Sequence, residues 1–254
     1  MAGFEQIFAS RYFGVKGAAK YRGNFDGPFI PKLKIFDEGF VGDAALQGWN
    51  EEEDNGTTIA HSAVDGGAET ITASGTALDC GELSHTAQWS PASNCGVLIK
   101  AKISQITTIA VACGLVDAKE NLDDHIGVEM SGSALRATTT TADAAVMIFD
   151  TDASVDKWYV ATSNNGTEGT PTAALGSLVP TANTYFYVAI QTDTSGNVTF
   201  YYGKAIDSLT AVGYKAAAIA YASTNLLTPY VGFIARSTDA SLCTVSRIIT
   251  WQDN

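Results

Sequence analysis

The stretch that most constrains the fold runs from residue 185 to residue 251, where four apolar runs are separated by turns. Residues 185–190 and 198–202 each have the alternation of a β-strand, and the segment between them is rich in Gly, Asn, Asp and Thr. Two such runs around such a turn are a strong signal for a β-hairpin. Two more strands are predicted over residues 226–235 and 244–251. This stretch therefore indicates an antiparallel sheet.

The middle of the chain continues the same pattern. In residues 97–103 the apolar side chains share one face of the predicted strand, while Lys100 and Lys102 share the other. That alternation is typical of a strand buried on one side. Residues 109–115 repeat it with small side chains, and the short connection predicts that the two strands pair antiparallel. Shorter runs that extend the series lie at 126–130, 144–149 and 158–161.

The number of strands sets the fold class. About ten to fourteen strands are predicted, and no amphipathic helix is longer than two turns. This pattern predicts an all-β fold, an antiparallel two-sheet jelly-roll sandwich. Residues 59–71 and 77–83 are predicted as weak strands near an edge. Residues 49–56 contain four consecutive carboxylates and are predicted as a solvated acidic loop, because they lack the spacing of a calcium loop.

Charge is distributed unevenly along the chain, whose 254 residues carry a formal net charge of −12. Residues 1–36 hold six basic and two acidic groups, which leaves nine basic and 25 acidic groups on residues 37–254. An acidic body repels phosphates, so nucleic acid is not an expected partner. We therefore predict two parts, an extended N-terminal arm (1–36) and a jelly-roll domain (37–254).

The predicted arm is also rich in aromatic residues, and it sustains neither a helical nor a strand period. Aromatic side chains together with arginine are favoured at protein interfaces. The arm is therefore predicted to dock on an acidic protein partner; the alternative is that it folds back on its own body. The residues predicted to contact the partner are Phe4, Phe8, Arg11, Tyr12, Phe13, Lys16, Lys20, Tyr21, Arg22, Phe25, Phe29, Lys32 and Lys34.

The four cysteines form no Cys-x-x-Cys pair and have no histidine at metal-ligand spacing, so neither zinc nor any other cofactor is predicted. Cys113 and Cys243 lie in apolar runs, where a free cysteine behaves as a small hydrophobe. Buried free thiols are expected, with a bridge between Cys80 and Cys95 as the alternative. No run approaches ~18 apolar residues, so a soluble protein without a membrane span is predicted.

Known catalytic motifs are missing from the chain. It has no Gly-x-Ser-x-Gly, no Gly-rich phosphate loop and no Glu-x-Asp-x-x-Glu strand, which would place two carboxylates on one face for sugar hydrolysis. Glu129 is expected to point to solvent, and a glycan hydrolase would depend on it. The carboxylates near His125 have no second histidine beside them, which argues against a metal site. We expect a protein that is not an enzyme.

Sugar binding without catalysis is the alternative that the aromatic residues leave open. Trp49 and Trp89 are the candidates for a flat aromatic glycan platform, and Trp158 and Tyr230 are weaker ones. Trp158 and Trp251 lie in apolar runs, so a role in the core is expected for them.

Several runs together resemble a known family. They are residues 158–165, 185–190, 193–201, 227–235 and 245–251, with further similarity at 37–42 and 97–115. In strand pattern and turn chemistry they resemble a group of tailed-bacteriophage virion proteins with a concanavalin A-like jelly roll. The resemblance covers about residues 37–254. Lectin-like and laminin-G-like domains share much of this pattern.

This resemblance implies a structural protein of the phage particle, most often a head decoration or cement protein. Such a protein would be made in the cytoplasm of the bacterial host and would sit on the virion surface. The arm would contact the major capsid protein or another virion protein, and the bodies would form a homo-oligomer, preferably a trimer. The alternative is a lectin-like, carbohydrate-binding module of a head or tail fibre. No membrane partner is expected.

Overall fold

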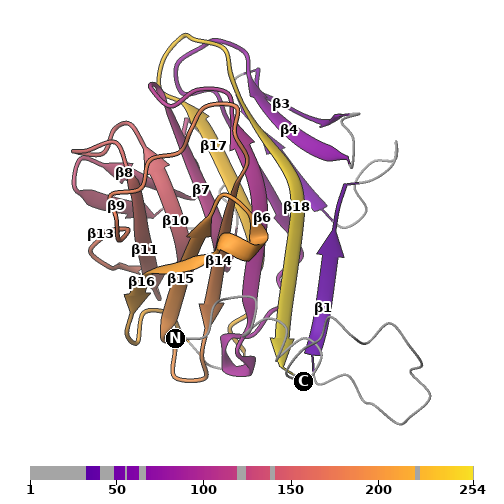
Figure 1. The fold of residues 1–254 in the computed structure, drawn as a ribbon, viewed down its shortest axis with the longest axis vertical. Coiled ribbons are helices and arrows are strands. Elements are labelled where there is room, and N and C mark those ends of the chain that lie inside the picture. Colours follow the sequence, from indigo (N-terminus) through magenta and orange to yellow (C-terminus); the bar gives the residue numbers. More distant parts are fainter. Residues whose placement is uncertain are drawn as a thin grey trace.

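The computed structural model describes residues 33–40, 49–54, 56–62, 67–118, 124–137, 141–220 and 224–253. These residues form two large antiparallel β-sheets, called sheet A and sheet B here, which face each other (Figure 1). The predicted fold class, an all-β jelly-roll sandwich, is confirmed.

Sheet A contains the first and the last strand of the described chain. Its order is β16 (Thr210–Lys215), β15 (Val198–Gly203), β14 (Phe186–Thr192), β6 (Gly96–Ile103), β18 (Ser241–Asp253), β4 (Ala68–Ala73) and β3 (Thr58–Ser62), and β1 (Leu33–Glu38) also pairs with β18. The 3-10 turns η2 (Pro91–Ser93) and η3 (Ile206–Ser208) lie in its connections.

The strands of sheet B lie between residues 49 and 235. Its order is β12 (Thr167–Glu168), β11 (Trp158–Asn164), β10 (Ala144–Asp150), β7 (Ile109–Val116), β17 (Thr228–Ala235), β5 (Cys80–His85) and β2 (Trp49–Glu53), and β13 (Thr172–Ala173) pairs with β11. A separate hairpin is formed by β8 (Val128–Ser131) and β9 (Ala134–Ala137).

The main core lies between the two sheets, where alternate side chains of facing strands meet. Val97 and Ile99 of β6 and Val111 and Cys113 of β7 are fully buried in it. A second apolar cluster lies on the other face of sheet B, under β8 and β9, and includes Met130. β7 is therefore buried on both faces, which explains why all of its side chains are apolar or small.

The longest strand, β18, organises sheet A. On one side it pairs with β6; on its other side β4 pairs with its first half and β1 with its second half. Figure 1 shows β1 and β4 following one another beside β18. Residues 33–36 of the predicted arm are thus part of an edge strand of sheet A, with Phe36 packed 6.1 Å from Trp49 between ring centroids.

The structure confirms some local predictions and corrects others. The hairpin predicted over residues 185–202 is present as β14 and β15. The antiparallel pairing predicted for residues 97–103 and 109–115 is wrong: β6 lies in sheet A and β7 in sheet B, and the connection crosses from one sheet to the other. Alternation reports that a strand has a buried face, but it does not say which strand lies beside it.

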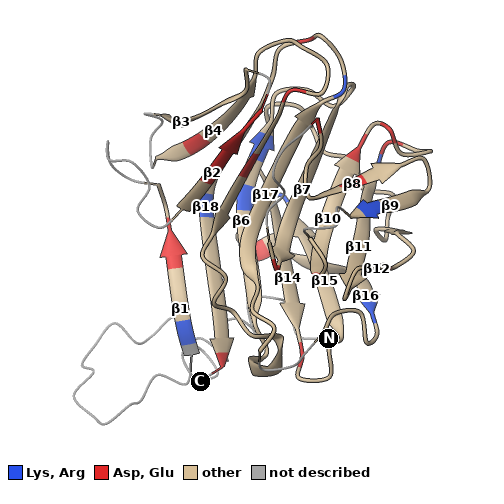
Figure 2. Cartoon of the chain, turned by 180° about the vertical axis from the view of Figure 1, so that it is seen from behind, with Lys and Arg blue, Asp and Glu red and all other residues tan. Residues whose placement is uncertain are grey.

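The acidic run at residue 49 is also a strand, not the predicted loop. β2 pairs with β5 at the edge of sheet B. An edge strand tolerates charged side chains and is protected by them against pairing with other chains. Figure 2 shows acidic positions on β1, β2 and β4.

Candidate functional site

The candidate site lies on the outer face of sheet A, the face that points away from sheet B. On β6 the odd-numbered side chains fill the core, so Leu98, Lys100 and Lys102 point outward. On the neighbouring strand β14, Tyr187 points to the same side as Leu98. The alternation of the two strands thus places two lysines next to a tyrosine.

A β-bulge brings an arginine to the same face. The register between β18 and β6 shifts between Val245 and Arg247, so Ser246 is the extra residue. Val245 and Ile248 both point into the core. In a regular strand Arg247, two positions after Val245, would also point inward; the bulge turns its side chain outward instead.

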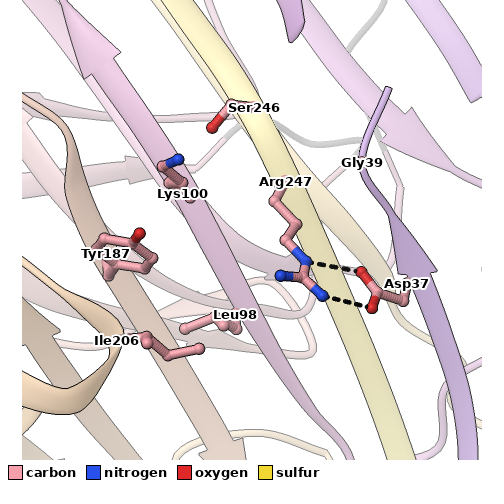
Figure 3. A pocket seen from close by; sticks show the side chains of 8 residues that line it. All are labelled: Asp37, Gly39, Leu98, Lys100, Tyr187, Ile206, Ser246 and Arg247. Atoms are coloured by element: carbon pink, nitrogen blue, oxygen red, sulfur yellow. Dashed lines mark hydrogen bonds and ion pairs between the residues drawn. The ribbon is translucent and has the colours of Figure 1, made fainter. Parts of the chain in front are cut away.

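These side chains line a groove of about 470 Å³, called the sheet A groove here. The volume is within the range of small-molecule sites. Figure 3 shows Tyr187 and Ile206 on one side, the guanidinium of Arg247 on the other and Leu98 between them. The lining residues are Asp37, Gly39, Leu98, Lys100, Tyr187, Ile206, Ser246 and Arg247.

Arg247 holds a carboxylate at the edge of the groove. Its Nε and Nη2 atoms donate to the two oxygens of Asp37 over 2.9 and 2.7 Å, a bidentate contact that Figure 3 marks. Both side chains remain partly exposed, at 49% for Arg247 and 35% for Asp37. The strand β1 carries Asp37 to this position through its pairing with β18.

The lysines lie over an aromatic ring. The Nζ atoms of Lys100 and Lys102 are 4.4 and 5.1 Å from the ring centroid of Tyr185, within the distance of a cation–π contact. The ring restrains both ammonium groups without neutralising them. Lys100 and Arg247 thus bring positive charge to the groove, although the chain as a whole is strongly acidic.

The floor of the groove is apolar. Leu98 belongs to an outer-face cluster with Ala189 and Ile249, and Ile206 at the rim is 37% exposed. The Ser246 hydroxyl, just beneath the surface, has no hydrogen-bond partner within the described residues. An apolar floor with a few convergent polar groups is the usual composition of a binding site for a small molecule.

The outer face of sheet B, unlike that of sheet A, is covered by another part of the chain. The hairpin of β8 and β9 lies over it, and Val128, Met130 and Leu135 are buried there against Ala112 and Val146 of sheet B. A buried polar contact lies within sheet B itself, where the hydroxyl of Tyr230 on β17 donates to Glu82 Oε1 on the neighbouring strand β5 over 2.5 Å. Burial, with the charge of Glu82, holds the pKa of Tyr230 well above its usual value.

A buried charge network ties this hairpin to sheet B. Arg236 Nη2 lies 3.0 Å from Glu129 Oε2 and 2.7 Å from Asp150 Oδ2. Glu129 Oε1 lies 2.9 Å from Arg136 Nη1 and 3.0 Å from His125 Nδ1. Although burial opposes its charge, hydrogen bonding and charge from Asp150, with the charge of Glu129, raise the pKa of Arg236.

The position of Glu129 corrects an expectation from the sequence. Its side chain is 3% exposed and both of its oxygens are ion-paired, so it does not point to solvent. An acid for sugar hydrolysis must reach the glycosidic oxygen. Glu129 is buried and ion-paired, so it cannot serve as the catalytic acid that the hydrolase hypothesis assigned to it.

The predicted aromatic glycan platforms are wrong as well. Trp89 is fully buried and Trp49 is 8% exposed, and both belong to the main core. Trp158 and Tyr230 are buried too. A platform for a sugar needs an exposed ring face. The faces of these rings are covered by other side chains; the Trp49 ring centroid, for example, lies 5.4 Å from that of His85.

Of the predicted arm contacts, Phe4, Phe8, Arg11, Tyr12, Phe13, Lys16, Lys20, Tyr21, Arg22, Phe25, Phe29 and Lys32 lie outside the described residues. Lys34 is described, and it contacts its own body. Its Nζ donates to Gln88 Oε1 over 2.9 Å and lies 4.6 Å from the ring centroid of Trp89. For Lys34 the fold-back alternative therefore holds.

All four cysteines are free and buried, as expected from their apolar surroundings. The alternative bridge between Cys80 and Cys95 is absent. Burial raises the pKa of Cys95 to about 12, although the Thr192 hydroxyl contacts it. Burial raises the pKa of Cys243 to about 12 as well.

The described residues offer neither a metal-binding cluster nor a membrane-spanning helix. No group of three or more His, Cys, Asp or Glu side chains among them could hold a metal ion. No helix in the described part of the chain is long and apolar enough to cross a membrane.

Solved structures with the same fold are found, although no family model and no curated protein matches the chain. The carbohydrate recognition domain of Emp47p matches with a TM-score of 0.57 at 9% identity, over 90% of this chain and 100% of that one. Peanut lectin matches with a TM-score of 0.54 at 9% identity, over 86% and 97%. The fold is lectin-like.

The same fold also occurs in an enzyme. The endo-β-1,4-glucuronan lyase of the fungus Trichoderma reesei matches with a TM-score of 0.52 at 11% identity, over 86% of this chain and 95% of that one. At such low identity these likenesses establish the concanavalin A-like sandwich and no activity.

Proposed function

We propose that this protein is a lectin-like, carbohydrate-binding module and that the sheet A groove is its binding site. The observation that carries the proposal is the groove itself, in which Tyr187 and the apolar floor of Leu98 lie beside Lys100 and Arg247. The lectin-like neighbours support it by showing that this sandwich accommodates sugar recognition.

The composition of the groove suits a sugar ring. A pyranose has an apolar C–H face and a rim of hydroxyl groups. A tyrosine ring offers a flat apolar face with a polar tip, and Leu98 and Ile206 extend the apolar surface. Lys100 and Arg247 supply hydrogen-bond donors around it. A sugar bound there would meet both kinds of surface at once.

The test is binding of the full chain to a panel of neutral and acidic oligosaccharides. Tyr187→Leu keeps the apolar volume and removes the aromatic ring, and we expect it to weaken binding by about ten-fold or more, as for an aromatic anchor. Tyr214→Leu is the matched control, since Tyr214 is 60% exposed and does not line the groove. The proposal would be refuted if no oligosaccharide of the panel bound, or if the two variants weakened binding equally.

The second candidate is the virion role, with the amino-terminal segment docked on a capsid protein. What supports it is the attachment point: β1 fixes residue 33 at the edge of sheet A, where it pairs with Asp253. Removal of residues 1–32 should leave a folded body that no longer joins phage particles. Full occupancy of particles by the shortened chain would count against this role.

A further inference from the structure

We infer that the ligand of the sheet A groove is a carboxylated saccharide, a chain containing hexuronate residues, and that Asp37 occupies the place of its carboxylate on Arg247. This inference rests on the proposed function and adds the chemical class of the ligand. It also assigns to Asp37 the role of an internal competitor.

The first argument is the geometry of Arg247. Its guanidinium already binds a planar carboxylate by two parallel contacts of 2.9 and 2.7 Å. This fork matches the geometry of a carboxylate, as it also matches that of a phosphate, and this distinguishes it from the point charge of a lysine. The position of the Asp37 carboxylate therefore marks a carboxylate place at the rim of the groove, on the side of the Arg247 guanidinium away from Leu98 and Tyr187 (Figure 3).

The second argument is that the pair can exchange. Arg247 and Asp37 are 49% and 35% exposed, and such partly exposed ion pairs stabilise a protein only weakly. Asp37 lies on β1, which pairs with only the second half of β18. A ligand carboxylate can therefore replace that of Asp37 without opening the core.

The third argument is the local charge balance. Lys100 and Arg247 give the lining of the groove two positive charges, and Asp37 is the one carboxylate among the lining residues. Lys102 lies outside the lining, over the ring of Tyr185. The net charge of −12 belongs to the whole chain. At physiological ionic strength, charges beyond about 8 Å are largely screened, so a bound ligand responds mainly to the nearby cations.

The apolar floor separates a saccharide from a simple anion. Leu98 and Ile206 offer nothing to an inorganic ion, but they offer contact area to the C–H face of a sugar. The combination of a fork for a carboxylate, further cations and an apolar floor is what a uronate requires.

The experiment compares two probes by calorimetry with the full chain. One is a tetrasaccharide of β-1,4-linked glucuronate and the other is cellotetraose, which has the same linkage and a hydroxymethyl group in place of each carboxylate. We expect the glucuronate to bind more tightly and its binding to weaken with added salt. Arg247→Gln should remove the preference between the two probes.

Asp37→Asn tests whether the Asp37 carboxylate competes with the ligand for Arg247. It should raise glucuronate affinity by up to about five-fold, the factor of one exposed ion pair, and leave cellotetraose binding unchanged. Asp207→Asn is the control: it removes the same charge from η3 beside the groove, but Asp207 does not line it. Equal effects of the two variants would overturn the role of Asp37.

The outcomes separate the inference from the function on which it rests. If cellotetraose binds as tightly as glucuronate and Tyr187→Leu abolishes both, the groove binds sugars and the assignment of a carboxylated ligand is wrong. If neither these probes nor any saccharide of the panel binds, the proposed function fails and the inference fails with it.

Discussion

Single residues in this protein show how burial sets the cost of a charge. Glu69 on β4 is 1% exposed, and its Oε1 lies 3.0 Å from His61 Nδ1. Burial raises the pKa of Glu69, the contact with His61 lowers it, and the charges of Glu51 and Glu38 add to the rise. The ionised carboxylate is therefore less favourable in the folded than in the unfolded chain.

This shift makes a prediction about pH. A carboxyl group whose folded pKa is raised contributes stability below its unfolded pKa, and that contribution is lost as pH rises through the folded pKa. Glu69→Gln cannot ionise, so its free energy of unfolding relative to the wild type should increase from pH 4 to pH 7. Urea unfolding at a series of pH values measures this difference. A difference that stays flat or falls with pH would contradict the argument.

At the scale of elements, the hairpin of β8 and β9 is held on sheet B by charge as well as by packing. Asp150 at the end of β10 accepts a hydrogen bond from the backbone N–H of Met130 on β8 over 2.9 Å, and it also binds Arg236. Asp150 is fully buried. Its charge is tolerated because Arg236 neutralises it.

We predict that Arg236→Met destabilises the protein by about 3–5 kcal/mol, because two buried carboxylates lose their partner. Arg136→Met is the matched control. Arg136 binds the same Glu129 but is 46% exposed, so a loss of about 1 kcal/mol or less is expected. Denaturant unfolding of the two variants measures both values. Similar losses would mean that the burial of Arg236 is not what makes its contact important.

At the scale of the whole molecule, the folded sandwich should protect all four thiols from reagents in the solvent. Cys95, Cys113 and Cys243 lie in the main core and Cys80 in the cluster under β8 and β9, so each becomes accessible only when a sheet opens. The raised pKa of each buried thiol reduces its thiolate fraction further.

Without reductant, the native protein should therefore react with a thiol reagent very slowly, and the denatured protein should take up four equivalents. Intact-mass measurement after alkylation counts the adducts. Two adducts in denaturant would indicate a disulfide and contradict the free thiols of the structure. Rapid native labelling at one cysteine would show that its part of the sandwich opens alone.

The sequence alone determined the fold class and many of the strands. Alternation is local, since a strand with one buried face needs apolar side chains at every second position, and the hairpin of β14 and β15 also has its turn chemistry in the sequence. Partner choice is not local. Nothing in residues 97–115 tells that β6 and β7 belong to different sheets, because either pairing would bury the same side chains.

The candidate site was decided by the tertiary structure. The sequence placed Lys100 and Lys102 on a common outer face. The bulge at Ser246, however, moves the Arg247 side chain to the opposite side of β18 from the one that regular alternation predicts. A two-residue period cannot reveal such a shift. Trp49 and Trp89 looked accessible because their sequence neighbours are polar, yet they are buried by strands distant in the chain. Exposure depends on those distant neighbours, and they are known only once the sheets are assembled.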